Sequence, residues 1–309
     1  MKVKKLLTAT LLCTVAAFAN DTMNKERFTE KLYADWGQSF TVDKELYSED
    51  DGVQKLVIFE NPLYGTVLAL DGIIQTTKKD EFFYHEMITH TALLSHDKPE
   101  NVLIVGGGDG GTLREVLRHK NVKEVTLVEI DGRVIKLCKQ YFPEHSKGAF
   151  NDPRTRIVIQ DAAKFVLTAP QKFDVIIADT TDPIGPGAAL FTPEFFANCK
   201  KALKKNGIFV NQCGVPFMQT EEMGETYHHL KKLYGNVQFC LVPVPTYVGG
   251  FMCLGWASDK KYNDISVSTL EKRLKNVTGE MRYYTPEVHK ASFALPLYMQ
   301  KAIAAGDKK

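Results

Sequence analysis

Acidic side chains recur where the predicted strands of this 309-residue chain end, and they are the residues best placed to do chemistry. They are Asp109, Glu129, Asp161 and the pair Asp179 and Asp182. Ligands of open α/β sheets bind beyond the carboxyl ends of the strands, so we expect these carboxylates to share one site. The strand-end motifs contain no matching basic residue, so the acids need cations. A metal ion would need ligand spacings that the sequence lacks, so we expect no metal, whereas the ammonium groups of an organic amine fit.

A glycine-rich turn follows the apolar segment 102–105, which predicts a buried parallel strand. Its pattern, Gly106-x-Gly108-x-x-Gly111, formally matches the dinucleotide fingerprint. Asp109 argues against a dinucleotide, because a carboxylate about 4 Å from a phosphate costs roughly 4 kcal/mol at an effective dielectric near 20. The turn therefore favours an adenosine-type ligand with a positively charged tail, and Glu129 can bind both ribose hydroxyls. The alternative is that Asp109 only caps the following helix.

A second acidic motif follows a strongly apolar strand that runs directly into Asp179. Pro183 and Pro186 prevent the segment after it from continuing as a helix, and two glycines beside them add mobility. This composition predicts a loop that closes over a ligand. The alternative is that Asp179 and Asp182 only cap turns.

The segment around His85 adds further polar side chains, but no metal motif. His85 and His90 lie roughly 140° apart on a helix, so they cannot bind one metal from one face. Each histidine alone is more often a surface or hydrogen-bonded residue than a ligand. Tyr84 is equally compatible with core packing and with function, and the spacing around Tyr247 favours a structural role. The sequence contains no Gly-x-Ser-x-Gly motif, which argues against a serine hydrolase.

Alternating strands and helices from residue 101 onward predict a doubly wound sheet of the α/β class. Candidate strands span residues 102–105, 123–130, 155–159, 174–178, 207–213, 236–244 and 251–257. Candidate helices span residues 82–94, 111–119, 132–141, 161–168, 193–204, 219–234, 265–275 and 286–304. The last two strands are joined by a short loop, so this end of the sheet is predicted to be antiparallel.

A small antiparallel β domain is predicted before this region. Residues 24–36 have the composition of a short helix, and short β-rich segments at 38–42, 54–59, 65–70 and 73–77 follow. Asp71-Gly72 between apolar segments predicts a hairpin. We therefore divide the chain into residues 1–22, an N-terminal β domain at 23–80 and a catalytic domain at 81–309.

The first 22 residues resemble a secretory signal peptide, with lysines before an apolar segment and a small-x-small motif at Ala17-Phe18-Ala19. The alternative is that translation starts at Met23. The rest of the composition is ordinary for a globular protein: 44% hydrophobic, 25% charged and a formal net charge of +2, which does not indicate a nucleic-acid partner. The six cysteines show no CxxC pair, and we expect buried free thiols.

Several long motifs, in this order, resemble those of the spermidine synthases, most closely the bacterial ones. They are Leu70-Asp-Gly-Ile-Ile-Gln-Thr76, Asp80-Glu-Phe-Phe-Tyr84-His-Glu-Met87, the glycine turn with Leu113-Arg-Glu115, Leu127-Val-Glu129-Ile-Asp131, Asp179-Thr-Thr-Asp-Pro-Ile-Gly-Pro186 and Pro245-Thr-Tyr247. The resemblance extends from about residue 36 to the C-terminus. The family commonly has Asp-Gly where this chain has Asp161-Ala162, and serines where threonines follow Asp179.

The resemblance implies a Rossmann-like, methyltransferase-type domain behind the small β domain. It also implies transfer of an aminopropyl group from decarboxylated S-adenosylmethionine to putrescine, giving spermidine and methylthioadenosine. The donor is a co-substrate, and no resident cofactor or metal is expected. Asp179 would be the general base. The donor would be held by Gln54, His85, Asp109, Glu129, Asp161, Ala162 and Pro186, and putrescine by Tyr84, Gln75, Asp179, Asp182 and Tyr247.

Two other functions remain open at this point: a methyltransferase on the same fold, and a polyamine-binding protein without catalysis. The resemblance further implies a homodimer or homotetramer that acts on small molecules, without a nucleic-acid or membrane partner. We expect a cytoplasmic protein, or an exported one if the leader is real.

Overall fold

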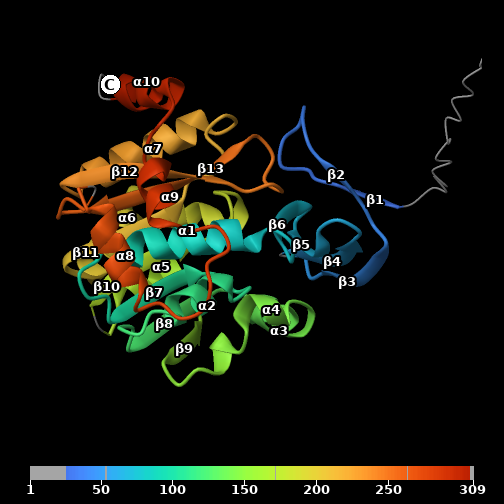
Figure 1. Cartoon of the computed structure of the whole chain (residues 1–309). Helices are drawn as coiled ribbons and strands as arrows, with labels where there is room; N and C mark the ends of the chain where they lie inside the picture. The colour runs from blue at the N-terminus through green and yellow to red at the C-terminus, as the bar shows by residue number, and fades with distance from the viewer. Residues whose placement is uncertain (1–25, 53, 171, 263, 307–309) are drawn as a thin grey trace, which may run out of the picture.

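A seven-stranded mixed sheet forms the centre of the larger part of the chain (Figure 1). The computed structural model describes residues 26–52, 54–170, 172–262 and 264–306. The strands are β7 (Asn101–Gly106), β8 (Glu124–Glu129), β9 (Thr155–Ile159), β10 (Phe173–Asp179), β11 (Leu203–Gln212), β12 (Asn236–Pro243) and β13 (Phe251–Ser258). Their order in the sheet is β12-β13-β11-β10-β7-β8-β9. β13 runs antiparallel to both neighbours and the other pairs are parallel, which confirms the predicted doubly wound sheet with an antiparallel end.

The strand order reverses between β7 and β10, which is where an open α/β sheet binds its ligand. In this pair the last residue of β10, Asp179, lies opposite Gly106. A Cβ atom on Gly106, whose φ is +77°, would lie 2.2 Å from the carbonyl oxygen of Asp179. Glycine is therefore required here, and it brings the glycine-rich turn against the end of β10.

Helices cover both faces of this sheet because residues along each strand alternate between two cores. Val102 and Ile104 of β7 join the core with the first set of helices, and Leu103 and Val105 join the core with the second. The first set is α1 (Glu81–Leu93), α2 (Gly111–Leu117), α8 (Val267–Leu274) and α9 (Pro286–Ser292), and the second is α5 (Ala162–Leu167), α6 (Pro193–Ala202) and α7 (Thr220–Lys231). α1 is buried along most of its length, so its polar residues are held inside the protein.

The smaller part is a four-stranded antiparallel sheet, which Figure 1 shows beside the N-terminal end of α1. Its strands are β3 (Lys44–Asp50), β4 (Lys55–Asn61), β5 (Gly65–Leu70) and β6 (Ile73–Thr77). One face packs on α3 (Gly132–Tyr141), and the other packs on Phe40. The predicted hairpin at Asp71-Gly72 is confirmed, with positive φ at both residues.

Two predicted features are wrong, and one strand was not predicted. Residues 27–29 form β1 (Arg27–Thr29), which pairs with β2 (Ser39–Thr41), instead of belonging to a helix over 24–36. Phe28 stacks on Phe59 at 5.0 Å, so packing on the sheet overrides helical composition. The helix over 286–304 is divided into α9 and α10 (Leu297–Gly306), and Pro296 lies at the break. β3 escaped prediction because most of its side chains are exposed and polar.

The loop after β10 is irregular only up to residue 184, because a 3₁₀ helix spans Gly185–Phe191. Pro186 lies in its first turn, where a missing N–H costs no hydrogen bond. Other short elements are α4 (Pro143–Ser146) and a 3₁₀ turn at Ala149–Asn151. The predicted leader, Met23 and Cys13 lie outside the described residues. Within the described part of the chain, all five cysteines are free and buried, and no helix is long and apolar enough to cross a membrane.

Candidate active site

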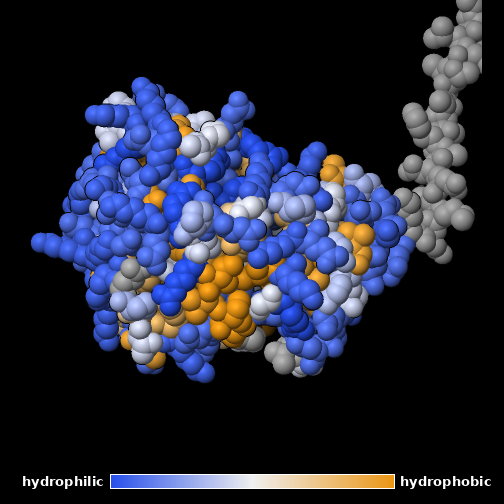
Figure 2. Space-filling model, turned by 90° about the horizontal axis from the view of Figure 1, so that it is seen from below, coloured by the Kyte–Doolittle hydropathy of each residue, from blue (hydrophilic) through white to orange (hydrophobic). Residues whose placement is uncertain are grey.

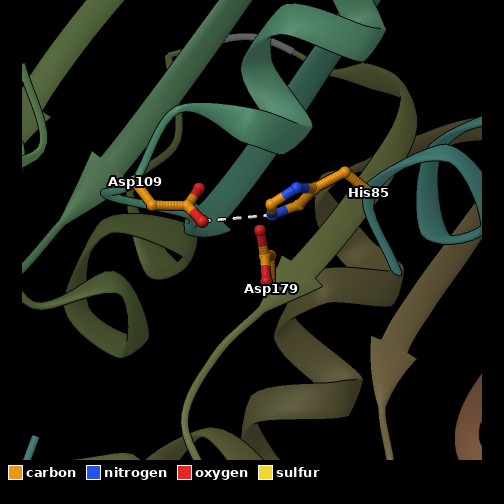
Figure 3. Close-up of side chains that lie close together, drawn as sticks. All are labelled: His85, Asp109 and Asp179. Atoms are coloured by element: carbon orange, nitrogen blue, oxygen red, sulfur yellow. Dashed lines mark ion pairs between the residues drawn. The ribbon is translucent and has the colours of Figure 1, made fainter. Parts of the chain in front are cut away.

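Asp109 contacts both the start of α2 and a side chain of α1. One carboxylate oxygen accepts the N–H of Gly111 at 2.8 Å at the start of α2. The other lies 3.2 Å from Nε2 of His85 (Figure 3). Gly111 has to be glycine for this contact, because a Cβ there would lie 2.2 Å from the His85 ring.

His85, which lies outside the strand-end motifs, is placed between two carboxylates and is a basic group that balances them. Its Nδ1 lies 2.6 Å from Glu81, and Glu81 is in turn 2.9 Å from the guanidinium of Arg114. Burial lowers the pKa of His85, but the charges and hydrogen bonds of Asp109 and Glu81 outweigh it and hold that pKa well above the usual value. Opposing burial, the same contact with His85 keeps the pKa of Asp109 below its ordinary value. The compensating cations come from helices rather than from strand ends.

Asp179 extends from the end of β10 toward His85 and Asp109, as Figure 3 shows, and one polar atom from each of the three residues lies within 4.8 Å of the others. Its carboxylate accepts the hydroxyl of Thr112 at 2.7 Å and is also hydrogen-bonded by Tyr84. Burial is the main cause of its raised pKa, and the negative charge of Asp109 raises it further. A carboxyl group with these neighbours binds protons more readily than an exposed aspartate does, which suits a base.

The trio of His85, Asp109 and Asp179 has the closeness of a metal site but not its chemistry. Both ring nitrogens of His85 already face carboxylate oxygens, so no ring lone pair is free for a metal ion. We interpret the trio as an ion-paired cluster.

The residues predicted to hold the amine lie beside Asp179. The hydroxyl of Tyr247 donates to the backbone oxygen of Gln75 at 2.8 Å, and the rings of Tyr84 and Tyr247 lie 6.2 Å apart. Burial, and then the charge of Asp179, raise the pKa of both tyrosines well above the ordinary value, so both hydroxyls keep their protons. The amide of Gln75 itself donates to Ile73 at 3.2 Å.

Asp182 lies beyond Asp179 and is held by a remote side chain. Its carboxylate accepts the Nε2 proton of Gln219 at 3.1 Å, and the same glutamine accepts the hydroxyl of Tyr33 at 3.3 Å. Burial raises the pKa of Asp182, with a smaller contribution from Glu222. The pair Asp179 and Asp182 therefore does more than cap turns: both carboxylates are held by side chains of other elements.

The residues predicted to hold the nucleoside follow β8 and β9. Glu129 accepts the N–H of Asp131 at 3.0 Å, and burial raises its pKa to about 7. Asp161 accepts the N–H of Ala163 at 2.9 Å at the start of α5, and Ala162 is buried.

Two apolar residues that the sequence did not single out adjoin these acids. Ile130 follows Glu129 and Ile159 ends β9, and they are 57% and 56% exposed. Figure 2 shows an apolar patch on the underside of the molecule, while most of the rest of this face is hydrophilic. An exposed apolar surface beside hydrogen-bonding acids suits a heteroaromatic base attached to a ribose.

The two remaining predicted donor residues, Gln54 and Pro186, belong to the N-terminal sheet region and to the segment after β10. Gln54 precedes β4, where its N–H is bonded to Asp51 at 2.9 Å, and Asp51 is paired with Arg133 of α3 at 2.6 Å. Pro186 lies in the first turn of the 3₁₀ helix that follows the acidic loop.

Sequence reasoning missed several side chains that hold the site together. They are Thr112 and Gln219, which donate to the two aspartates, and Arg114, which pairs with Glu81 behind His85. A signal existed for Glu81, because it lies one helical turn before His85, and i, i+4 pairs interact on a helix. Gln219 gave no signal, because only the tertiary structure brings it to Asp182.

The fold and the site define a class of protein: a Rossmann-like enzyme of the methyltransferase type whose ligand site is acidic at the point where the strand order reverses. Comparison with known proteins narrows this class. The model of the spermine/spermidine synthase domain matches residues 81–269, and that of the spermidine synthase tetramerisation domain matches residues 27–78. This chain belongs to the spermine/spermidine synthase family.

Relatives with curated names agree. A polyamine aminopropyltransferase of Erwinia tasmaniensis is 49% identical over 280 residues, covering 90% of this chain and 98% of that protein. One from Shigella sonnei is 48% identical over 282 residues, covering 91% and 98%.

Solved structures are also similar. A spermidine synthase in complex with the transition state analogue AdoDATO has a TM-score of 0.86 at 39% identity, covering 91% of this chain and 95% of that one. The spermidine synthase of Thermotoga maritima has a TM-score of 0.82 at 37% identity, covering 90% and 94%.

Proposed function

We propose that this chain transfers the aminopropyl group of decarboxylated S-adenosylmethionine to putrescine, giving spermidine and methylthioadenosine. That it is an aminopropyltransferase of polyamine biosynthesis follows from its family and its curated relatives. The observation that supports the proposed substrates is the meeting of Asp109 and Asp179 at the strand reversal, within 4.8 Å of one histidine. Two acids on separate loops provide for two cationic substrates.

On the donor side, Asp109 binds the ammonium of the aminopropyl tail, Glu129 the ribose hydroxyls and Asp161 with Ala162 the adenine. Gln54, His85 and Pro186 complete this half of the site, and Ile130 and Ile159 supply apolar surface. Since Asp109 is ionised, it repels the carboxylate of ordinary S-adenosylmethionine, which disfavours methyl transfer from that compound.

On the acceptor side, Tyr84, Gln75, Asp182 and Tyr247 orient putrescine, and Asp179 accepts a proton from the attacking amine. The nitrogen then attacks the carbon beside the sulfonium. A C–N bond forms, the C–S bond breaks, and its electron pair leaves with sulfur as a neutral thioether. Holding both cations in line within an acidic pocket supplies much of the acceleration. Because the sulfonium is already a good leaving group, the mechanism includes no metal or resident cofactor, and a chelator should leave the rate unchanged.

The test is methylthioadenosine release from the purified chain, with decarboxylated donor and putrescine, cadaverine or spermidine in parallel. We expect the highest kcat/KM with putrescine. Release with a longer amine as the best acceptor would replace the proposed substrate. Tight putrescine binding without release would make this a binding protein, and a methylated product would make it a methyltransferase.

We also propose a homodimer or homotetramer, supported by the match of residues 27–78 to a tetramerisation domain. Analytical ultracentrifugation distinguishes these states, and a monomer at micromolar concentration would contradict both. Because its relatives are biosynthetic enzymes, we propose a cytoplasmic location. Mass spectrometry of the N-terminus would show whether residues 1–19 are removed by export.

A further inference from the structure

A buried series of alternating charges runs from the site into the protein. Asp109 faces His85 at 3.2 Å, His85 faces Glu81 at 2.6 Å, and Glu81 faces Arg114 at 2.9 Å. Arg114 also pairs with Glu115 at 2.7 Å. Exposure of these side chains is low, with 10% for Arg114 and 6% for Glu81, so solvent screens the series weakly.

The geometry of His85 fixes its protonation. A neutral imidazole has one N–H, so one ring nitrogen would direct a lone pair at a carboxylate oxygen. Glu81 is ionised because Arg114 binds it, and Asp109 is stabilised as an anion by the N–H of Gly111. Both ring nitrogens therefore donate, and His85 is an imidazolium.

Other charged or titratable groups around His85 agree with this assignment. Asp109 and Glu81 flank His85 in the series. Tyr84 lies next to His85 on α1, and Asp179 approaches it from β10. Arg282 approaches the second oxygen of Glu81 at 3.7 Å and also favours the anion. His145 of α4 lies 6.0 Å from the His85 ring, and burial lowers its pKa to about 4, so it adds no competing charge at neutral pH.

The positive charge of His85 bears directly on Asp179. Burial and Asp109 both favour the protonated form of Asp179, whereas His85 opposes them. A protonated Asp179 cannot accept a proton from an amine, so the fraction of active enzyme depends on the cation.

We propose that Glu81 and Arg114 are positioning residues that hold His85 as a fixed cation, and that this cation keeps Asp179 ionised before the amine arrives. The inference rests on the proposed function, in which Asp179 is the base. Neither Glu81 nor Arg114 needs to touch a substrate.

The test is the pH profile of methylthioadenosine release by Glu81→Gln. This change keeps size and hydrogen bonding but removes the charge. We expect the acid limb of kcat to move up by about one pH unit, so that the rate falls about tenfold below the midpoint and recovers at higher pH. A rate lowered equally at every pH, with the midpoint unchanged, would overturn the inference.

Two variants serve as controls. Glu81→Asp restores the charge and should restore the wild-type midpoint. Glu86→Gln makes the same change on the same helix at a buried acid that accepts backbone N–H groups of residues 282–284. Its pH midpoint should equal that of the wild type, even if the protein becomes less stable.

A second readout is independent of the reaction. Histidine-labelled protein without substrate should show His85 as an imidazolium at pH values where an ordinary histidine is neutral, and Glu81→Gln should shift its titration to lower pH. A neutral His85 at pH 7 in the wild type would overturn the inference. If the wild type releases no methylthioadenosine, the proposed function fails, and the resonance of His85 alone then decides its charge.

Discussion

The two proposed halves of the site, one for the donor and one for the acceptor, hold their acids in different ways. In the donor half, Asp109, Glu129 and Asp161 each accept the backbone N–H of the residue two positions later. In the acceptor half, Asp179 is held by a threonine 67 positions away and Asp182 by a glutamine 37 positions away. Apart from the contact between Asp109 and His85, the donor half is built from local turns, whereas the acceptor half is built from contacts between distant segments.

This difference indicates which substitutions should disturb each half of the site. A local backbone contact survives any side-chain change outside its own turn. The acceptor half depends on remote side chains, as in the bond between Tyr247 and Gln75, which are 172 positions apart. We therefore expect donor affinity to depend on few residues and acceptor affinity on many.

The largest expected effect is that of Asp179→Asn. Loss of a general base lowers kcat by about 10²- to 10⁴-fold, and the fold should remain intact. Steady-state release of methylthioadenosine measures kcat, and a thermal melt tests whether the fold is intact. Asp174→Asn, a buried acid at the other end of β10, is the matched control and should retain its kcat. Normal turnover by Asp179→Asn would show that Asp179 is not the general base.

Asp109→Asn tests the donor half. Losing one charged hydrogen bond is worth roughly 1.5–3 kcal/mol, so the KM for decarboxylated donor should rise about 10- to 150-fold. Discrimination against ordinary S-adenosylmethionine should fall as well, as competition assays would show. Asp131→Asn, which alters an acid two residues after the end of β8 that pairs with Arg133, should bind the donor normally. A selectivity equal to that of the wild type would contradict the role of Asp109.

The pKa of Glu129 predicts a pH dependence confined to the donor half. Its raised value, about 7, means that the free folded protein binds a proton there that the unfolded chain releases at lower pH. This group therefore lowers the free energy of unfolding as pH rises from about 4.3 through 7. The ionised form accepts ribose hydroxyls, so methylthioadenosine affinity should rise about tenfold between pH 6 and 8. Titration calorimetry should find no such pH dependence of methylthioadenosine affinity in Glu129→Gln. If the dependence persists in this variant, Glu129 is not the group that binds the ribose.

Tyr247→Phe should have the smallest effect. It leaves the backbone oxygen of Gln75 without its donor, which costs about 0.5–1.5 kcal/mol. We expect a KM for putrescine about 3- to 10-fold higher and an unchanged KM for the donor. Tyr262→Phe removes a similar bond, to Asn206, outside the site and should change neither. An equal rise in the KM for putrescine and the KM for the donor would contradict the division of the site into two halves.

The same contrast explains how much could be predicted from the sequence. Strand ends and glycine turns are local signals, and they placed Asp109, Glu129 and Asp161 at one edge of the sheet. The cation beside them was missed because His85 reaches Asp109 from another segment. The wrong helix over 24–36 has the same cause, since only tertiary packing on Phe59 makes Phe28 part of a strand.

The register that sets Gly106 opposite Asp179 also has a consequence for the order in which the protein folds. The N-terminal strands β3 to β6 pair as successive hairpins, which form quickly because their contacts are close in the chain. Pairing of β7 with β10 has to close a loop that contains two other strands and their helices. Asp109 and Asp179 therefore meet late, after the chain has emerged from the ribosome past residue 179. A newly made chain has formed its N-terminal hairpins before it has a binding site for either substrate.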